Sequence, residues 1–193
     1  MGGLLFFFTY YASPEYTDVG YEPDQPISYS HKFHVGTLGL DCRYCHSFVE
    51  TSAEANIPAT EKCMNCHQNI QKNSDELKKL KDTWNHAENI EWIKVHMLPD
   101  YAYFDHSVHI NSKIGCASCH GRVDQMEKVM QVEPLSMSWC LDCHRDPAKH
   151  IRPDNVSVTQ MDWVASDEHE EKMNEYIKIH KISPPEDCTA CHR

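Results

Sequence analysis

The 193-residue sequence lacks most of the features that identify the common protein classes. Glycine occurs only 7 times, less often than proline at 10. Hydrophobic residues make up 40% of the chain, and the mean hydropathy is negative. No long alternating strand pattern, nucleophile elbow, phosphate-binding loop or isolated carboxylate pair is present, which argues against a hydrolase. At this length the chain is one domain or two small ones, and something other than aliphatic packing must hold it together.

Basic residues are also scarce. Lys and Arg together number 18 against 29 Asp and Glu, for a formal net charge of −11. Because nucleic-acid binding relies on clustered Lys and Arg, this balance excludes nucleic acid as an expected partner. The acidic surface either keeps the protein soluble or favours docking of a partner with a basic patch. Charge alone leaves both readings open.

A long apolar run is missing as well. The N-terminal run at 2–12, GGLLFFFTYYA, has no Lys or Arg before it to form the basic region of a signal peptide. As a helix it would reach about 16 Å, against roughly 30 Å of hydrocarbon in a bilayer. It could be the outer end of a longer anchor, an interfacial segment or a piece packed on a membrane partner. Because Tyr10, Tyr11 and Tyr16 suit a membrane interface, we expect residues 1–20 to be membrane-proximal rather than a buried strand.

What the chain has in excess is cysteine and histidine, with 10 and 14 residues. Cys-rich chains of this size are usually disulfide scaffolds, metal proteins or haem proteins, and the spacing decides among these. Every cysteine belongs to one of five Cys-x-x-Cys-His motifs, CRYCH at 42–46, CMNCH at 63–67, CASCH at 116–120, CLDCH at 140–144 and CTACH at 188–192.

This motif supplies what covalent attachment of haem c requires. Two thiols form thioethers with the haem vinyl groups, and the adjacent histidine reaches the iron. A redox dithiol needs a single copy with a low-pKa thiolate in a βαβ setting. Zinc needs four converging ligands, for which the histidine would be surplus, and iron–sulfur clusters use other cysteine spacings. Five copies that use every cysteine therefore predict five haem c groups as cofactors.

The predicted ligands follow directly from the motifs. The thioether cysteines are Cys42, Cys45, Cys63, Cys66, Cys116, Cys119, Cys140, Cys143, Cys188 and Cys191, and the proximal iron ligands are His46, His67, His120, His144 and His192. Two His-x-x-His pairs, His31 with His34 and His106 with His109, precede motifs in both halves at nearly equal distances, so we predict that they are distal ligands. Residues three apart on a helix share a face but diverge, so one pair can serve two haems.

The fifth distal ligand is not fixed by the pattern. His96, His150, His86, His169 and His180 are available, as are Met126, Met137 and Met161. A methionine ligand would raise the potential of that haem relative to two histidines. His150 and Met126 are the leading candidates. Whichever of the two is not the ligand would have a structural role.

The order of the motifs suggests an internal repeat. His31 to Cys42 spans eleven positions and His106 to Cys116 spans ten, as expected of units that bury their faces against one another. We expect an N-terminal segment at 1–20, dihaem modules at 21–100 and 101–150, and a tail at 151–193 with the fifth haem. Helices are predicted at 74–82, with Ser74 as N-cap, and at 167–180, where Pro184 and Pro185 would stop the second. In that second helix Asp167 and Glu170 have the spacing of a capping box, and Met173, Tyr176, Ile177 and His180 lie on one face. The expected fold is mostly α with extensive loops and little β, a multihaem cytochrome c fold of the class III type organised around five haems.

Several segments resemble the pentahaem cytochrome c subunit of alternative complex III. They are PISYSHKFHVGTLGLDCRYCHSFVE, IPATEKCMNCH, WIKVHMLPDYAYFDHSVHI, GCASCHGRVDQM, PLSMSWCLDCHR and CTACHR, and the likeness covers 21–193. The resemblance implies an electron-transfer subunit on the periplasmic side of a bacterial respiratory membrane. It would relay electrons from quinol, through an iron–sulfur/molybdopterin-like subunit, to a monohaem cytochrome c or a terminal oxidase.

Irons with both axial positions filled cannot bind substrate, so we expect no chemistry of the chain's own beyond electron transfer. Two other functions stay open. One is a soluble periplasmic pentahaem carrier that feeds a reductase. The other is a multihaem enzyme with one open haem, which the surplus of distal candidates disfavours.

Overall fold

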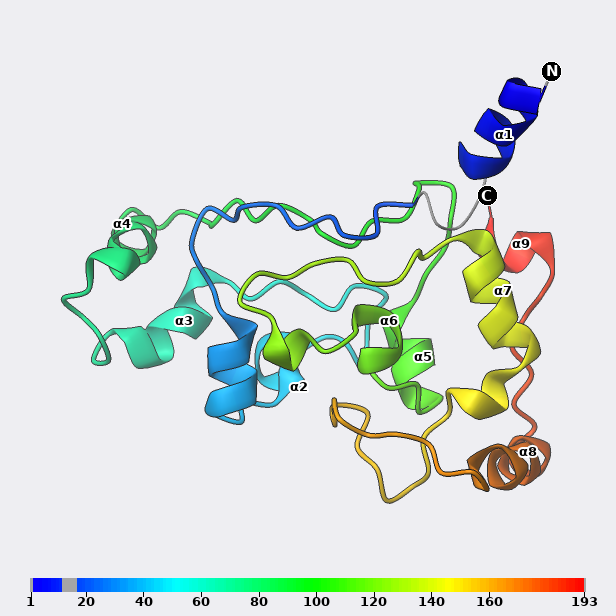
Figure 1. The fold of residues 1–193 in the computed structure, drawn as a ribbon. Coiled ribbons are helices and arrows are strands. Elements are labelled where there is room, and N and C mark those ends of the chain that lie inside the picture. The colour runs from blue at the N-terminus through cyan, green and yellow to red at the C-terminus, as the bar shows by residue number, and fades with distance from the viewer. Residues whose placement is uncertain (1, 12–16, 193) are drawn as a thin grey trace.

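The fold is a set of short helices joined by long loops. The computed structural model describes residues 2–11 and 17–192, and Figure 1 shows the path of the chain. The α-helices are α1 (Gly2–Tyr11), α2 (Cys42–Cys45), α3 (Thr60–His67), α4 (Lys78–Asn85), α5 (His106–Asn111), α6 (Ala117–His120), α7 (Met137–Arg145), α8 (His169–His180) and α9 (Cys188–Cys191). The other helical segments are η2 (Lys32–Thr37), a π-helix, and the 3₁₀ helices η3 (Asp75–Leu77), η4 (Val123–Gln125) and η5 (Pro147–Lys149).

Regular β-structure is absent from the described part of the chain. It contains only two isolated antiparallel bridges, Ala102 with His192 and Ile114 with Ile151. The prediction of a mostly helical, loop-rich fold with little β is therefore confirmed.

Both helices predicted between the motifs are present, but their starts differ from the prediction. η3 and α4 together cover the first, and Ser74 precedes them in an extended conformation without a side-chain capping hydrogen bond. The second helix, α8, begins at His169 instead of residue 167, and Glu168 at its N-cap makes no side-chain cap. Lys181, in the left-handed conformation at φ 53°, ends α8 before the prolines are reached.

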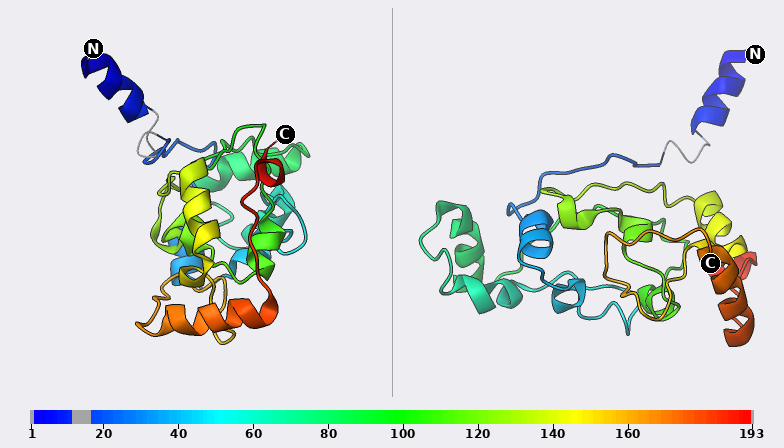
Figure 2. Two further views of the ribbon diagram at one scale, coloured as in Figure 1. Left: turned by 90° about the vertical axis from the view of Figure 1, so that its right-hand side faces the viewer. Right: turned by 60° about the horizontal axis from the view of Figure 1, so that its bottom comes forward.

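The helices are arranged in a long row. In Figure 1, α3 and α4 lie at one end, α2, α6 and α5 occupy the middle, and α7, α8 and α9 lie at the other end. The right view of Figure 2 shows the same order along the long axis. Long loops run lengthwise along the row (Figure 1), so neighbours in space are often distant in sequence.

The apolar core is divided into two small clusters. One contains Ile27, Met64 and Leu80, with Trp92 and others packed around it. The other contains Ala148, Ile151 and Met173 and fixes α8 against η5. Large apolar side chains beside the motifs stay exposed, among them Phe33 (48%), Phe48 (54%) and Val108 (59%). Aliphatic packing therefore holds only the two ends of the row.

The N-terminal helix α1 lies apart from the row in Figures 1 and 2, and its residues are all exposed. Its apolar side chains include Phe6 and Phe8, at 70% and 63% exposed. Residues 12–16, with Tyr16 of the expected interfacial tyrosines, lie outside the described residues. Among the residues described, no helix is long and apolar enough to span a bilayer.

Candidate haem-binding sites

Each Cys-x-x-Cys-His motif lies in or at the end of a short helix, and none of the ten cysteines, all within the described residues, forms a disulfide. Residues three apart on a helix lie on one face, so the two thiols of each motif are presented together. In three of these helices a carboxylate or hydroxyl side chain at the N-cap accepts a hydrogen bond from an amide of the first turn. Asp41 accepts from the Arg43 amide at α2, Ser136 from the Trp139 amide at α7, and Asp187 from the Ala190 amide at α9. These caps satisfy amides that would otherwise be unpaired in very short helices.

The two His-x-x-His pairs have the same local geometry. In the first half, the Tyr29 ring lies 4.8 Å from His31 at 85° and 4.4 Å from His34 at 19°. In the second half, Phe104 lies 4.8 Å from the first histidine of its pair at 86° and 4.6 Å from the second at 27°. The repeat seen in the sequence is thus also a repeat of side-chain geometry, in which one aromatic ring orients both imidazoles.

Three motif histidines each face a histidine from a His-x-x-His pair. The ring centroids are 6.3 Å apart for His34 and His67, 6.4 Å for His106 and His120, and 6.2 Å for His109 and His144. A metal–imidazole bond is about 2 Å and the ring centre lies roughly 1 Å further, so two imidazoles on opposite sides of one iron have centroids about 6 Å apart. The observed separations have this size, and the two histidines of α5 face different motifs.

The imidazoles are also oriented by backbone hydrogen bonds. In six of the nine predicted ligands, Nδ1 donates to a main-chain carbonyl at 2.6 to 3.3 Å, namely His34, His46, His67, His106, His109 and His144. A proton held on Nδ1 leaves the Nε2 lone pair available to a metal, and such a partner is usual for metal-bound histidine.

Burial keeps the central imidazoles neutral. It lowers the pKa of His120 to about 3, with the charges of His96 and His106 acting in the same direction. Burial, followed by the charge of neighbouring His46, lowers the pKa of His31 to about 4. Because only neutral imidazole has a lone pair to give to iron, both groups are in the ligating form at neutral pH.

Some buried nitrogen atoms have no protein partner. They include Nδ1 of His31 and Nε2 of His96 and of His169. Leaving a buried polar atom unpaired costs free energy, so such atoms mark positions where a ligand could bind. Of these, His96 lies against a motif histidine, because its ring centroid is 4.4 Å from that of His120.

The two leading candidates for the fifth distal ligand lie in different places. Met126 follows η4, and its carbonyl accepts from the Lys32 amide at 3.0 Å, which places it beside the first His-x-x-His segment. His150 follows η5, is half-buried, and has its pKa lowered mainly by burial. The last motif histidine, His192, lies 5.8 Å from the Tyr101 ring. Sequence reasoning ranked His96 below His150 and Met126 because only the fold reveals its buried nitrogen.

The donor set fits haem c better than a multidentate metal site. Across residues 2–11 and 17–192, no group of three or more His, Cys, Asp or Glu side chains is placed to hold a metal ion. The histidines instead meet in pairs, and one member of each pair directly follows a Cys-x-x-Cys. Two thiols with an adjacent imidazole, and a second imidazole opposite, are the groups by which a protein holds a six-coordinate haem c.

Two family comparisons agree with this geometry. Residues 33–100 match the cytochrome c3 family, and residues 102–193 match the family of cytochrome c7 and related cytochrome c. The chain is therefore a multihaem c-type cytochrome, a protein of electron transport.

A particular relative extends the comparison. Over 100 residues the chain is 32% identical to the multihaem cytochrome c subunit of a menaquinone reductase from Nitratidesulfovibrio vulgaris. The match covers 51% of this chain and 47% of the relative, so the chain matches about half the length of that protein.

Proposed function

We propose that the chain binds five haem c groups, one at each motif, and uses them to relay electrons. The ten cysteines would form the thioethers, and His46, His67, His120, His144 and His192 would be the proximal ligands. The observation that carries the proposal is the separation of 6.2 to 6.4 Å between three of these rings and three rings of the His-x-x-His pairs. When bound, haem supplies an iron that takes up and gives up one electron at a time.

The same geometry supports a specific set of distal ligands. His34 would serve the haem of His67, while His106 and His109 would serve those of His120 and His144. His31 would serve the haem of His46, whose charge acts on it. The remaining distal ligand would be His150, Met126 or, on account of its unpartnered nitrogen, His96. Changing each of the three to alanine separately should convert one haem to the high-spin form in one variant and not in the others.

The role of the protein is then to position the haems and to close their irons to substrate. Backbone carbonyls hold the imidazole rings, and the distal ligands would occupy the positions where a substrate could otherwise bind. Exposed apolar side chains near the motifs, such as Phe48 and Val108, would cover the porphyrin faces. Carbon monoxide or cyanide binding to the native protein at any of the five irons would contradict this closed arrangement.

At the level of the complex, we propose a subunit of a membrane quinol-oxidising oxidoreductase of the alternative complex III type. It would lie on the periplasmic side, with an iron–sulfur/molybdopterin-like subunit as donor and a monohaem cytochrome c or an oxidase as acceptor. Oxidation of one quinol releases two electrons and two protons, and the electrons would enter the haems singly. The likeness to a menaquinone reductase subunit supports a quinone-linked complex, although that relative's name describes the reduction of quinone.

The haem count tests the first part of the proposal. The mass of the purified protein should exceed that of the 22.4 kDa polypeptide by five haem groups, and a pyridine haemochrome assay should return five equivalents per chain. Fewer equivalents, or the bare polypeptide mass, would contradict it.

Purification from native membranes tests the second part. The chain should be recovered in a detergent-solubilised multisubunit particle, and a quinol analogue should reduce its haems. Recovery as a free monomer in detergent-free buffer would support the soluble carrier instead. If a quinone oxidises the haems but a quinol does not reduce them, electrons flow from the haems to quinone, opposite to the direction proposed here.

A further inference from the structure

The first and second motifs are neighbours in the fold. Asn65, inside the second motif, donates to the hydroxyl of Tyr44, inside the first, at 3.4 Å. The Lys62 ammonium lies 4.8 Å from the centre of the same Tyr44 ring. His34, which precedes the first motif in the chain, faces His67 of the second. Motifs 42–46 and 63–67 therefore form one adjacent pair.

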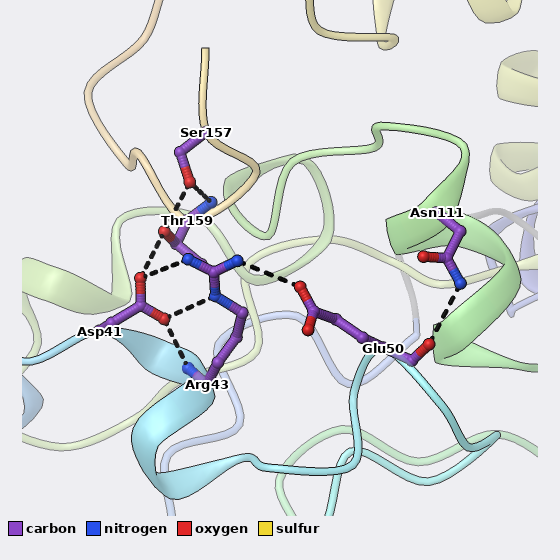
Figure 3. Close-up of polar contacts among 6 residues, drawn as sticks. All are labelled: Asp41, Arg43, Glu50, Asn111, Ser157 and Thr159. Atoms are coloured by element: carbon purple, nitrogen blue, oxygen red, sulfur yellow. Dashed lines mark hydrogen bonds and ion pairs between the residues drawn. The ribbon is translucent and has the colours of Figure 1, made fainter. Parts of the chain in front are cut away.

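The first motif also contacts the third, although 69 residues, 47–115, separate them in the chain. The thiols of Cys42 and Cys116 lie close enough together that each shifts the pKa of the other. Residues 157–159 bridge the same two motifs, because Thr159 donates to Asp41 at 3.0 Å and the Cys116 amide donates to the Val158 carbonyl at 3.0 Å. Figure 3 shows Thr159 beside the Asp41 carboxylate at the start of α2.

Two further arrangements hold this junction in place. Arg152 is 3% exposed, donates to the Ser157 carbonyl, and lies 5.3 Å from the Trp163 ring, which fixes the bridging loop. On the other side, Arg43 binds Asp41 and Glu50, and the Glu50 carbonyl accepts from Asn111 of α5 at 3.1 Å (Figure 3). The bridging loop and α5 thus tie the first motif to the second half of the chain.

The third and fourth motifs share α5. His106 faces His120 and His109 faces His144, so one helix of six residues reaches both. The cysteines of the fourth motif lie close enough to the Cys119 thiol to raise its pKa, in addition to the larger effect of burial. Motifs 116–120 and 140–144 therefore form a second adjacent pair.

The fourth motif contacts the fifth through the segment before Cys188. His144 donates to the Pro185 carbonyl at 2.6 Å, and Arg145 pairs with Glu186 at 3.4 Å. Cys191 in turn lies close enough to the Cys140 thiol to raise its pKa, in addition to the larger effect of burial. In Figures 1 and 2, α7 and α9 both lie at the end of the row opposite α3.

From these contacts we infer that the motifs follow one another in space in the order 63–67, 42–46, 116–120, 140–144 and 188–192. The second motif in the chain is thus terminal, and the first connects the two halves. The inference rests on the proposed five-haem function. It makes the haem at 63–67, with exposed Cys66, and the haem at 188–192, with exposed Cys188, the two ends at which redox partners exchange electrons.

The order can be tested with a spectroscopic marker in the haem-loaded protein. His34→Ala should make the haem at 63–67 high-spin and distinguishable by electron paramagnetic resonance. In that background, Cys42→Ala with Cys45→Ala removes the haem inferred to be its neighbour. Cys116→Ala with Cys119→Ala, the matched control, removes a haem one step further away. Because magnetic relaxation by a neighbour falls steeply with distance, the first deletion should slow relaxation of the marker several-fold and the control should leave it nearly unchanged. The reverse result overturns the order.

A second measurement does not depend on whether the deletion variants fold. An anomalous-scattering map of crystals of the unmodified protein locates the irons, and the thioether links identify them. The iron bound to His46 should have those of His67 and His120 as its two nearest neighbours, and any other pair overturns the order. Five irons in a different order would refute this inference alone, whereas a haem count below five would refute the proposed function.

Discussion

At the scale of the residue, a hydrogen bond and a neighbouring ring set the orientation of the predicted ligands. A carbonyl on Nδ1 directs Nε2 outward, and an aromatic two residues before each His-x-x-His pair stacks on its second histidine. The sequence predicted the residue types and their spacing. It could not predict the carbonyl partners, since the one for His106 is Ala53, 53 positions away in the chain.

His109→Ala tests ligation by α5. Its ring faces His144 at 6.2 Å, so its loss should convert one haem in five to the high-spin form and leave the others low-spin. His86→Ala is a matched control, because His86 makes the same bond to the carbonyl four residues earlier but is exposed. Electron paramagnetic resonance of the oxidised proteins measures the outcome, and a spectrum identical to the parent would remove His109 from the ligand set.

Asp41 should make stability depend on pH in the acid range. Hydrogen bonds from Arg43 are the main cause that lowers the pKa of Asp41 from 3.8 to about 2. A carboxyl with a depressed folded-state pKa contributes stability that is present above its unfolded pKa and is lost as the pH falls through the folded one. In Asp41→Asn this contribution is absent, so the stability difference from the parent should shrink between pH 4 and 2.

Urea unfolding followed across that range gives the measurement. Glu54→Gln, an exposed acid from the loop after the same motif, is the control and should follow the parent at every pH. A difference between Asp41→Asn and the parent that stays constant from pH 4 to 2 would contradict the role assigned to the Asp41 carboxylate.

At the scale of the element, side-chain caps and short apolar faces determine where helices form. For α8, the sequence predicted part of the buried face but not the residue at which the helix begins. The spacing predicted that Met173, Tyr176, Ile177 and His180 share one face of the helix. The first three pack in the second apolar cluster, whereas His180 is exposed. The acids at its start suggested a capping box, but the structure has no side-chain cap there and the helix begins two residues later.

Met173→Ala should destabilise the end of the row that α8 covers. Met173 is 6% exposed, in one cluster with Ala148 and Ile151, and truncation of a buried methionine costs about 2–5 kcal/mol. Ile179→Ala on the same helix removes a side chain that is 66% exposed and should change stability by less than about 0.5 kcal/mol. Chemical denaturation of the two variants compares these effects, and equal losses would rule out the packing argument.

Cys188→Ala tests whether the C-terminal motif is an independent site. It should weaken attachment of the terminal haem and leave the other four in place. Thr189→Ala is the control, because it changes the same short helix through a hydroxyl bond to Asp187 without touching a thiol. Mass spectrometry under denaturing conditions counts the haems, and loss of all five would mean that the whole fold needs this tail.

At the scale of the whole molecule, the two apolar clusters are too small to hold the row together. In the described part of the chain only eight apolar residues are buried, and just one large side chain, Ile151, is almost fully so. Fixing the backbone costs roughly 1–2 kcal/mol per residue, which this burial cannot offset. Folding should therefore depend on haem.

Expression without haem attachment tests this dependence. The chain made in a compartment that lacks haem c maturation should be largely unfolded by circular dichroism and cut rapidly by protease. The haem-loaded chain should resist the same protease. A protease-resistant, cooperatively unfolding chain without haem would contradict the view that porphyrin replaces an aliphatic core.

The sequence by itself determined the number of motifs, the cysteine and histidine types at each, the repeat and the helical character, because each depends on residue identity and on spacing within a few turns. Only the tertiary structure decided which histidines face each other, where the buried nitrogen of His96 lies, and that residues 157–159 bridge the first and third motifs. Those relations join residues far apart in the chain, and they depend on how loops fold back along the row, which no local pattern records.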